Sequence, residues 1–447
     1  MKRDAALNFD FVPYWTIPFR FFLTAPLFAV LAGIILGFQG GFLLLSGDSI
    51  LWQSRWLKEV IFILHLITIG TVTMVMVGAL FQITSVVGGR LLPGGKIMPA
   101  VVYGGLTAGV VLFLWAMLSE TSWLFAAAAC LIVLALLVLA VCGLWAMNRA
   151  QRNSSTLRSM RLSLLSLLVM IGVGGWLLLM HGYPDSFVFD RRLTDFHLLW
   201  ALAGWVGLLI MGVSFQVIPM FHVTPSFGQR YQRWAPAVIF VSLIGASVID
   251  FYYAGTLVSS AAKGLLIGCF GVYSVQVWRL LNKRKRKIED ITVLFWRTAI
   301  ISLMGFIILQ LFFELGVLSN GGDKVWLLSG VLLIFGVIVS VIGGMLQKII
   351  PFLSYLHMQR FCAGNFEAIK SLPHMRAILK IKHSRYFYRL HLSSLFFLML
   401  MIWVPEATLL AGLSICIEFL LLFFMTARVA HMVWKTERNS LPANAQL

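Results

Sequence analysis

Two histidines in apolar segments are spaced so that their imidazole rings could bind a metal or a haem iron. His65 precedes Gln82 by 17 residues, and His197 precedes Gln216 by 19. On a helix these separations are about 25 Å and about 28 Å, so both rings would lie at a similar depth. An unpartnered imidazole is costly among apolar residues, whereas haem iron and copper both accept a neutral imidazole. We therefore predict His65 and His197 as cofactor and metal ligands, with hydrogen bonding between helices as the alternative role.

Three glutamines close nearly the same phrase, at almost constant spacing. The phrases are Gly78-Ala79-Leu80-Phe81-Gln82, Gly212-Val213-Ser214-Phe215-Gln216 and Gly343-Gly344-Met345-Leu346-Gln347. Gln216 follows Gln82 by 134 residues, and Gln347 follows Gln216 by 131. On a helix the first glycine of each phrase shares a face with the glutamine, which allows close packing and a hydrogen bond across the contact. The pattern favours a clamp between helices, and a polar path from the cytoplasm is the second interpretation.

Four charged residues interrupt apolar segments, which makes them candidates for function in a membrane. They are Glu418, Glu314, Lys263 and Asp250. An ion pair between Asp250 and Lys263 would remove the cost of burying each charge alone. Protonated, hydrogen-bonded carboxyl groups are one interpretation of the two glutamates, and a proton relay or a proton-coupled carrier is the other. Four histidines at segment ends are interpreted as interfacial residues: His181, His222, His391 and His431.

The segments that must position these residues are those of a membrane protein. The chain is 60% hydrophobic and 12% charged, and about 20 apolar residues span a bilayer as a helix. The five cysteines have no paired spacing, so we interpret them as small buried hydrophobic residues. We predict an all-α polytopic membrane protein with twelve transmembrane helices, at 17–38, 59–83, 98–118, 122–147, 160–180, 195–219, 235–254, 257–280, 293–317, 325–350, 388–405 and 407–429.

The glutamine phrases divide these helices into equal groups. They end the second, sixth and tenth predicted helices, and each group therefore contains four helices. The pattern predicts a pseudo-threefold arrangement of four-helix units, roughly 17–147, 160–280 and 293–429. We expect a single membrane domain over residues 1–447.

Lys and Arg are concentrated in alternate connections, which indicates the cytoplasmic face. With twelve crossings both termini would lie in the cytoplasm, and the membrane would be the inner (plasma) membrane. The net charge of +18 then reflects topology, and basic loops such as 283–287 would contact anionic lipids. No nucleic-acid recognition module accompanies these loops, so nucleic acid is not an expected partner. Residues 352–387 mix apolar and basic side chains and are predicted as a cytoplasmic interfacial segment.

This organisation resembles the haem–copper oxidase subunit I superfamily, and more closely its divergent NnrS-like and uncharacterised twelve-span members. The phrases that carry the resemblance lie at 65–70, 76–82, 216–222 and 347–352. The resemblance places His65 at the position of a haem ligand and His197, more loosely, at that of a copper ligand. It implies haem b, copper, respiratory electron transport and other membrane or redox subunits as partners.

Other parts of the family pattern are missing. Residues 325–350 contain no histidine where the family has His-x-His, and residues 235–254 contain none either. Ala201 stands where the family has a tyrosine. Because the haem–copper binuclear centre of this family would be incomplete, we expect a haem- or metal-binding protein that handles redox equivalents, metal or nitrogen oxides. Whether it is an enzyme stays open. The alternatives are a proton-coupled membrane transporter and an assembly or interaction subunit of a membrane complex.

Overall fold

The computed structural model describes residues 12–46, 54–150, 153–285, 288, 290–318 and 322–440. The secondary structure of these residues is helical, with no strand among them. Eleven of the described helices are long and apolar enough to cross a membrane. The prediction of an all-α, polytopic membrane protein is therefore confirmed. The predicted cytoplasmic termini fall largely on residues 1–11 and 441–447, which lie outside the described residues, as do Arg286 and Lys287 of the basic loop.

The chain forms two compact units. Unit 1 is built mainly from Ala79–Lys287, and unit 2 from Tyr14–Gly78 and Ile288–Leu447. The helix α3 (Met74–Gly88) begins in unit 2 and ends in unit 1. The other elements of unit 1 are α4 (Ile97–Ser119), α5 (Ser122–Asn148), α6 (Ser155–Gly182), α7 (Arg191–Leu199), η4 (Trp200–Gly207), α8 (Leu208–His222), α9 (Gln229–Tyr253) and α10 (Leu257–Asn282).

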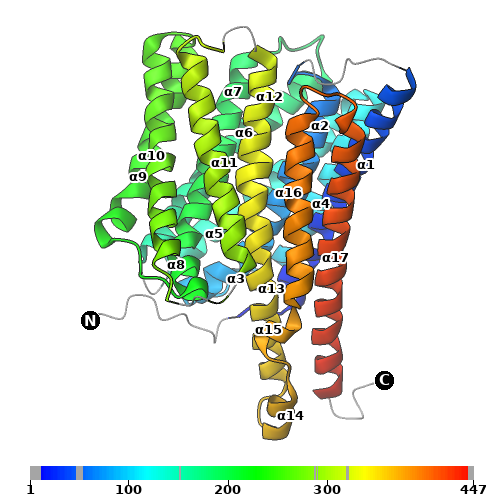
Figure 1. The fold of residues 1–447 in the computed structure, drawn as a ribbon, viewed down its shortest axis with the longest axis vertical. Helices are drawn as coiled ribbons and strands as arrows, with labels where there is room; N and C mark the ends of the chain where they lie inside the picture. Colours follow the sequence, from blue (N-terminus) through cyan, green and yellow to red (C-terminus); the bar gives the residue numbers. More distant parts are fainter. Residues whose placement is uncertain are drawn as a thin grey trace. The chain divides into compact units, whose positions relative to one another are not determined.

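Unit 2 contains the first helices of the chain together with the last ones. Its elements are α1 (Thr16–Ser46), α2 (Lys58–His65), η3 (Leu66–Thr73), α11 (Ile291–Glu314), α12 (Gly322–Gly330), η6 (Val331–Val339), α13 (Ser340–Phe361), α14 (Phe366–Ser371), α15 (Met375–Ile378), α16 (Ile381–Leu400) and α17 (Ala407–Ser440). Within this unit α13, α16 and α17 run side by side, and α1 packs along α17 (Figure 1).

Helix α16 is the element that corresponds to the predicted span at 388–405, and it is not among the eleven candidates. Its first half carries Lys382, Arg385 and Arg389, and these charges lower the apolar character on which such a count depends. The predicted interfacial segment 352–387 is built from the end of α13, the short helices α14 and α15 and the start of α16. Its position at a membrane surface stays a prediction.

Three of the long helices contain a π-helical segment at matching positions. Trp200, the first residue of η4, follows Leu66 of η3 by 134 residues, and Val331 of η6 follows Trp200 by 131. These intervals equal those of the three glutamines. A π-helix is rare and is frequent at functional sites, because its wider turn displaces side chains and carbonyl groups. The repeat found in the sequence thus recurs as a repeat in backbone geometry.

Each π segment also carries a glycine that faces the preceding long helix. A Cβ at Gly70 would lie 2.8 Å from Phe28 of α1, and one at Gly204 would lie 2.6 Å from the Cβ of Ser166 in α6. A Cβ at Gly336 would lie 2.6 Å from the hydroxyl of Ser302 in α11. Since these contacts leave no room for a side chain, glycine sets how closely each π segment packs.

Candidate functional site

The centre of unit 2 holds a buried acid and base in direct contact. Glu418 of α17 and His391 of α16 are both fully buried, and Oε1 of Glu418 lies 2.8 Å from Nδ1 of His391. His391 is the eleventh of the twenty residues of α16, and Glu418 is eleven residues after the start of α17. The pair therefore lies well inside both helices and away from their ends, where water cannot share the charge.

The second ring nitrogen of His391 is bonded as well. Nε2 lies 2.7 Å from Oγ of Ser340, which is also fully buried. Ser340 follows η6 directly, and its hydroxyl donates to the carbonyl oxygen of Phe335 at 3.4 Å. The ring of Phe335 stacks on His391 at 5.0 Å with an interplanar angle of 13°. The π segment η6 thus positions both the serine and the aromatic face that hold the imidazole.

These contacts determine how many protons the site holds. In the tautomer that carries a proton on Nε2, the ring donates to Ser340, whose hydroxyl donates to the carbonyl group of Phe335. The contact between Nδ1 and Glu418 then contains one proton, either on the carboxyl group or on an imidazolium. Removing this proton would leave an uncompensated negative charge, and adding another would leave a positive one; both are costly when buried.

Two aromatic rings also contact His391. Phe335 and Phe295 both face His391, with Phe295 tilted by 43° at 5.2 Å between ring centroids. Aromatic faces attract an imidazolium through their quadrupole. Oε2 of Glu418 accepts no hydrogen bond from the residues that the structure describes. This oxygen is the one side-chain acceptor of the site to which no described residue donates.

The predicted clamp is present at one of the three glutamines. Oε1 of Gln347 on α13 accepts a hydrogen bond from Ser384 of α16 at 2.8 Å, and both residues are 7% exposed. Gln82 is equally buried, but its amide has no hydrogen-bond partner in the described part of the chain. Gln216 is half-buried on α8. The polar-path interpretation of the three residues stays a prediction.

The two histidines predicted as ligands are each held by a backbone carbonyl group. Nδ1 of His65 lies 2.7 Å from the carbonyl oxygen of Ile61, one turn earlier in α2. Nδ1 of His197 lies 3.1 Å from the carbonyl oxygen of Met170 in α6. A Cβ at Gly174 would lie 2.7 Å from the ring of His197. Metal-binding histidines are usually oriented in this way, because a bonded Nδ1 fixes the tautomer that presents the Nε2 lone pair.

That these two rings bind one cofactor stays a prediction, because His65 belongs to unit 2 and His197 to unit 1. Within the described ranges no three His, Cys, Asp or Glu residues are grouped as metal ligands. A haem needs only one or two axial histidines, so the orientation of each ring fits that role taken singly.

The other charged candidates lie nearer to the ends of their helices. The predicted ion pair is present: Nζ of Lys263 lies 3.0 Å from Oδ1 of Asp250, which also accepts from Ser259 at 2.5 Å. The two charged side chains are 30% and 14% exposed. Glu314 is exposed at the last residue of α11. Glu418 is thus the only one of the four candidates that is fully buried.

Two members of the buried site, His391 and Ser340, were not predicted from the sequence. His391 was interpreted as an interfacial residue at the start of a span, and this is wrong, because α16 begins ten residues earlier. A signal was present, since the buried positions of α16 recur at helical spacing: Ser384, Phe387, His391, Ser394, Leu395 and Leu398. Ser340 gave no such signal, because its role follows from the π segment before it.

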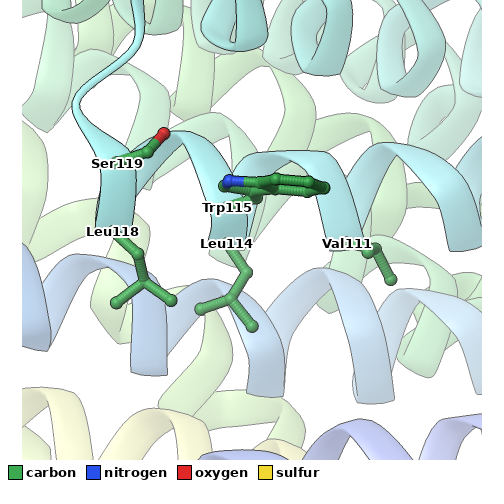
Figure 2. Close-up of a pocket in the computed structure, with 5 residues that line it drawn as sticks. All are labelled: Val111, Leu114, Trp115, Leu118 and Ser119. Carbon is green, nitrogen blue, oxygen red and sulfur yellow. The ribbon is translucent and has the colours of Figure 1, made fainter.

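An open hollow on the surface of unit 1 offers no comparable chemistry. It is lined by residues of α4 alone, and Ser119 is its one polar side chain (Figure 2): Val111, Leu114, Trp115, Leu118 and Ser119. An apolar helix surface of this kind is what a lipid-facing segment presents. The site in unit 2 therefore remains the principal candidate.

Comparison with known proteins adds no family to this description. No protein-family model matches the chain, and no curated protein shows significant similarity to it.

Proposed function

We propose that this chain is a membrane protein that moves protons, with Glu418 and His391 as its proton-binding pair. The observation that supports the proposal is the fully buried contact of 2.8 Å between an acid and a base at the centre of a helical unit. A membrane helix bears the cost of burying such groups when they serve a proton relay or a coupled carrier. Ser340 positions the imidazole, and Phe335 stabilises its protonated form.

The same connectivity of serine, histidine and acid occurs in hydrolases. Acyl transfer also needs an exposed nucleophile and N–H groups that hold an oxyanion. Ser340 is fully buried, and its own N–H donates to the carbonyl group of Phe335 inside the helix. These features favour a proton-binding role over a nucleophilic one.

Proton flux into liposomes tests the proposal. The purified protein would be reconstituted with a pH-sensitive dye inside, and a potassium diffusion potential would drive protons inward. We expect flux from the wild type and a fall to the level of empty liposomes in Glu418→Gln, which keeps size but cannot exchange a proton. Glu314→Gln is the matched control, because Glu314 is exposed at a helix end, and it should keep the wild-type rate. Equal flux in Glu418→Gln and the wild type would refute the proposal.

Haem b binding is the second candidate function, favoured by the carbonyl groups that orient His65 and His197. Haem would supply reversible one-electron chemistry, and the histidines would act as its axial ligands. A reduced-minus-oxidised absorption spectrum of protein prepared with haem and copper supplied is the test. We expect His65→Ala to lose the haem signal and Glu418→Gln to keep it. A wild-type protein with neither haem nor copper would remove this candidate.

We further propose twelve crossings of the inner membrane, with α16 as the twelfth and both termini in the cytoplasm. The full burial of His391 in the middle of α16 supports a crossing, since it places this helix inside the bundle. The nearly equal spacing of η3, η4 and η6 supports a pseudo-threefold arrangement of the four-helix groups. Basic loops would then meet anionic lipids, and other membrane subunits would bind elsewhere on the surface.

A further inference from the structure

Helices α13 and α16 are joined by two polar contacts in antiparallel register. Gln347 bonds to Ser384 at 2.8 Å, and Ser340 bonds to His391 at 2.7 Å. Ser340 precedes Gln347 by seven residues, and His391 follows Ser384 by seven. Two helical turns, or about 10 Å, therefore separate the two contacts along both helices.

The contact between Gln347 and Ser384 lies next to charged groups that water reaches. Lys348 forms an ion pair of 2.9 Å with Asp290, and their side chains are 26% and 16% exposed. Asp290 also caps α11 by accepting the N–H of Thr292 at 3.1 Å. This end of the unit can therefore exchange protons with the surrounding water, whereas the pair well inside both helices cannot.

An apolar barrier lies between the two polar contacts. Phe387 of α16 is 1% exposed and packs on Phe295, and a Cβ at Gly343 of α13 would lie 3.3 Å from its ring. A small void of about 10 Å³, lined almost entirely by apolar side chains, lies here. Its lining comes from the end of η6 and from α13, α16 and α17, with Thr71 among the residues of α1, η3 and α3 opposite: Val339, Ile342, Gly343, Leu346, Phe387, Phe419 and Leu422.

The size of this void shows that the barrier is closed. A proton crosses about 10 Å only along a chain of roughly three hydrogen-bonded waters, since each step spans about 2.8 Å. A void of about 10 Å³ is at the lower limit for one water, and an apolar lining keeps such voids dry. Displacement of one aromatic ring would enlarge it, because glycine at position 343 presents no side chain to that ring.

We propose that Phe387 and Gly343 form a hydrophobic gate that controls proton access to Glu418 and His391 from the end marked by Gln347 and Ser384. In the closed state the ring of Phe387 fills the space beside Gly343. When the ring swings away, water enters the void and connects the two polar contacts. The gate rests on the proposed proton-binding function and adds the route by which the pair exchanges its proton.

Hydrogen–deuterium exchange at the buried pair tests the gate. The protein in lipid vesicles would be transferred to deuterated buffer, and infrared bands of Glu418 and His391 would be followed in time. The bands are assigned by their loss in Glu418→Gln and His391→Gln. We expect Phe387→Ala to speed exchange by about tenfold or more, a change of about 1.4 kcal/mol in the barrier. Gly343→Ala should slow it, because the added methyl group takes up part of the void and holds the ring in place.

The matched control is Phe396→Ala on the same helix, because Phe396 is 55% exposed. It should leave the exchange rate unchanged. Phe387→Leu, which keeps most of the volume, should give a smaller acceleration and carries the test if the alanine variant does not fold.

Wild-type rates in both Phe387 variants would overturn the gate, as would equal acceleration by Phe396→Ala. If liposomes show no proton flux while exchange follows the expected order, the gate stands and the transport function fails.

Discussion

At the scale of single residues, the contact between Glu418 and His391 decides both stability and chemistry. Each group is fully buried, so each depends on the other to balance its charge or its hydrogen bond. Breaking a buried pair costs far more than replacing both members by apolar groups. Comparing the stability of a single variant with that of the double variant therefore tests whether the two groups are in contact.

We predict that His391→Phe lowers the free energy of unfolding by about 3–5 kcal/mol, because Glu418 then lacks its partner. The double variant His391→Phe with Glu418→Leu should recover most of this loss, since no polar group stays buried without a partner. Denaturant unfolding in detergent would measure both. A double variant less stable than the single one would show that the pair is not coupled as described.

Of the three residues of this site, only Glu418 could be predicted from the sequence. Glu418 stands out because a carboxyl group interrupts an apolar run. Its partner does not, since Lys382, Arg385 and Arg389 place His391 in what looks like a basic surface segment. The contact depends on how α16 packs against α17, which is a tertiary property that local composition does not contain.

At the scale of elements, the π segments explain how the long helices pack. Each lies in a helix whose apolar run predicted a regular span, because apolar composition does not distinguish an α-turn from a π-turn. The glycines at positions 70, 204 and 336 are the sequence feature that could have indicated the π segments, because one of them lies in each segment. The helices themselves were predictable because their apolar runs are long, although their observed ends extend beyond most predicted limits.

We predict that Gly204→Ala destabilises unit 1 by about 1–3 kcal/mol, the usual cost of overpacking. The added Cβ would lie 2.6 Å from that of Ser166, and one of the two helices must move. Gly264→Ala in α10 is the control, because no atom lies within 4 Å of its added Cβ; it should be neutral or stabilising by about 0.5–1 kcal/mol. Thermal unfolding of both variants measures the difference. Equal stability of the two would contradict the close packing of η4.

At the scale of the whole molecule, the charge pattern and the helices together define a topology. Basic connections alternate with connections poor in Lys and Arg, as expected when the basic ones stay in the cytoplasm. Among the residues that the structure describes, eleven helices are long and apolar enough to cross a membrane, and an odd number of crossings would place the termini on opposite sides. Whether α16 crosses the membrane therefore decides on which side the C-terminus lies.

We predict that a reporter inserted at Glu406, between α16 and α17, reports the outside of the cell. Reporters after Lys285 and at the C-terminus should report the cytoplasm, because Lys and Arg remain inside. Paired alkaline-phosphatase and fluorescent-protein fusions measure both outcomes. A cytoplasmic signal at Glu406 would show that α16 does not cross, and the arrangement of twelve helices would then be wrong.

The measurement that tests the proton-binding site most directly is an infrared titration of the protein in membranes. We expect an infrared band that is absent in Glu418→Gln and that changes when the pH of the buffer is changed. A ring band absent in His391→Gln should shift together with it, because a change on the carboxyl group alters the 2.8 Å contact that both groups share. Bands of Glu418 that stay constant over the whole pH range in which the protein is folded would contradict the account, since the pair would then be only a structural contact.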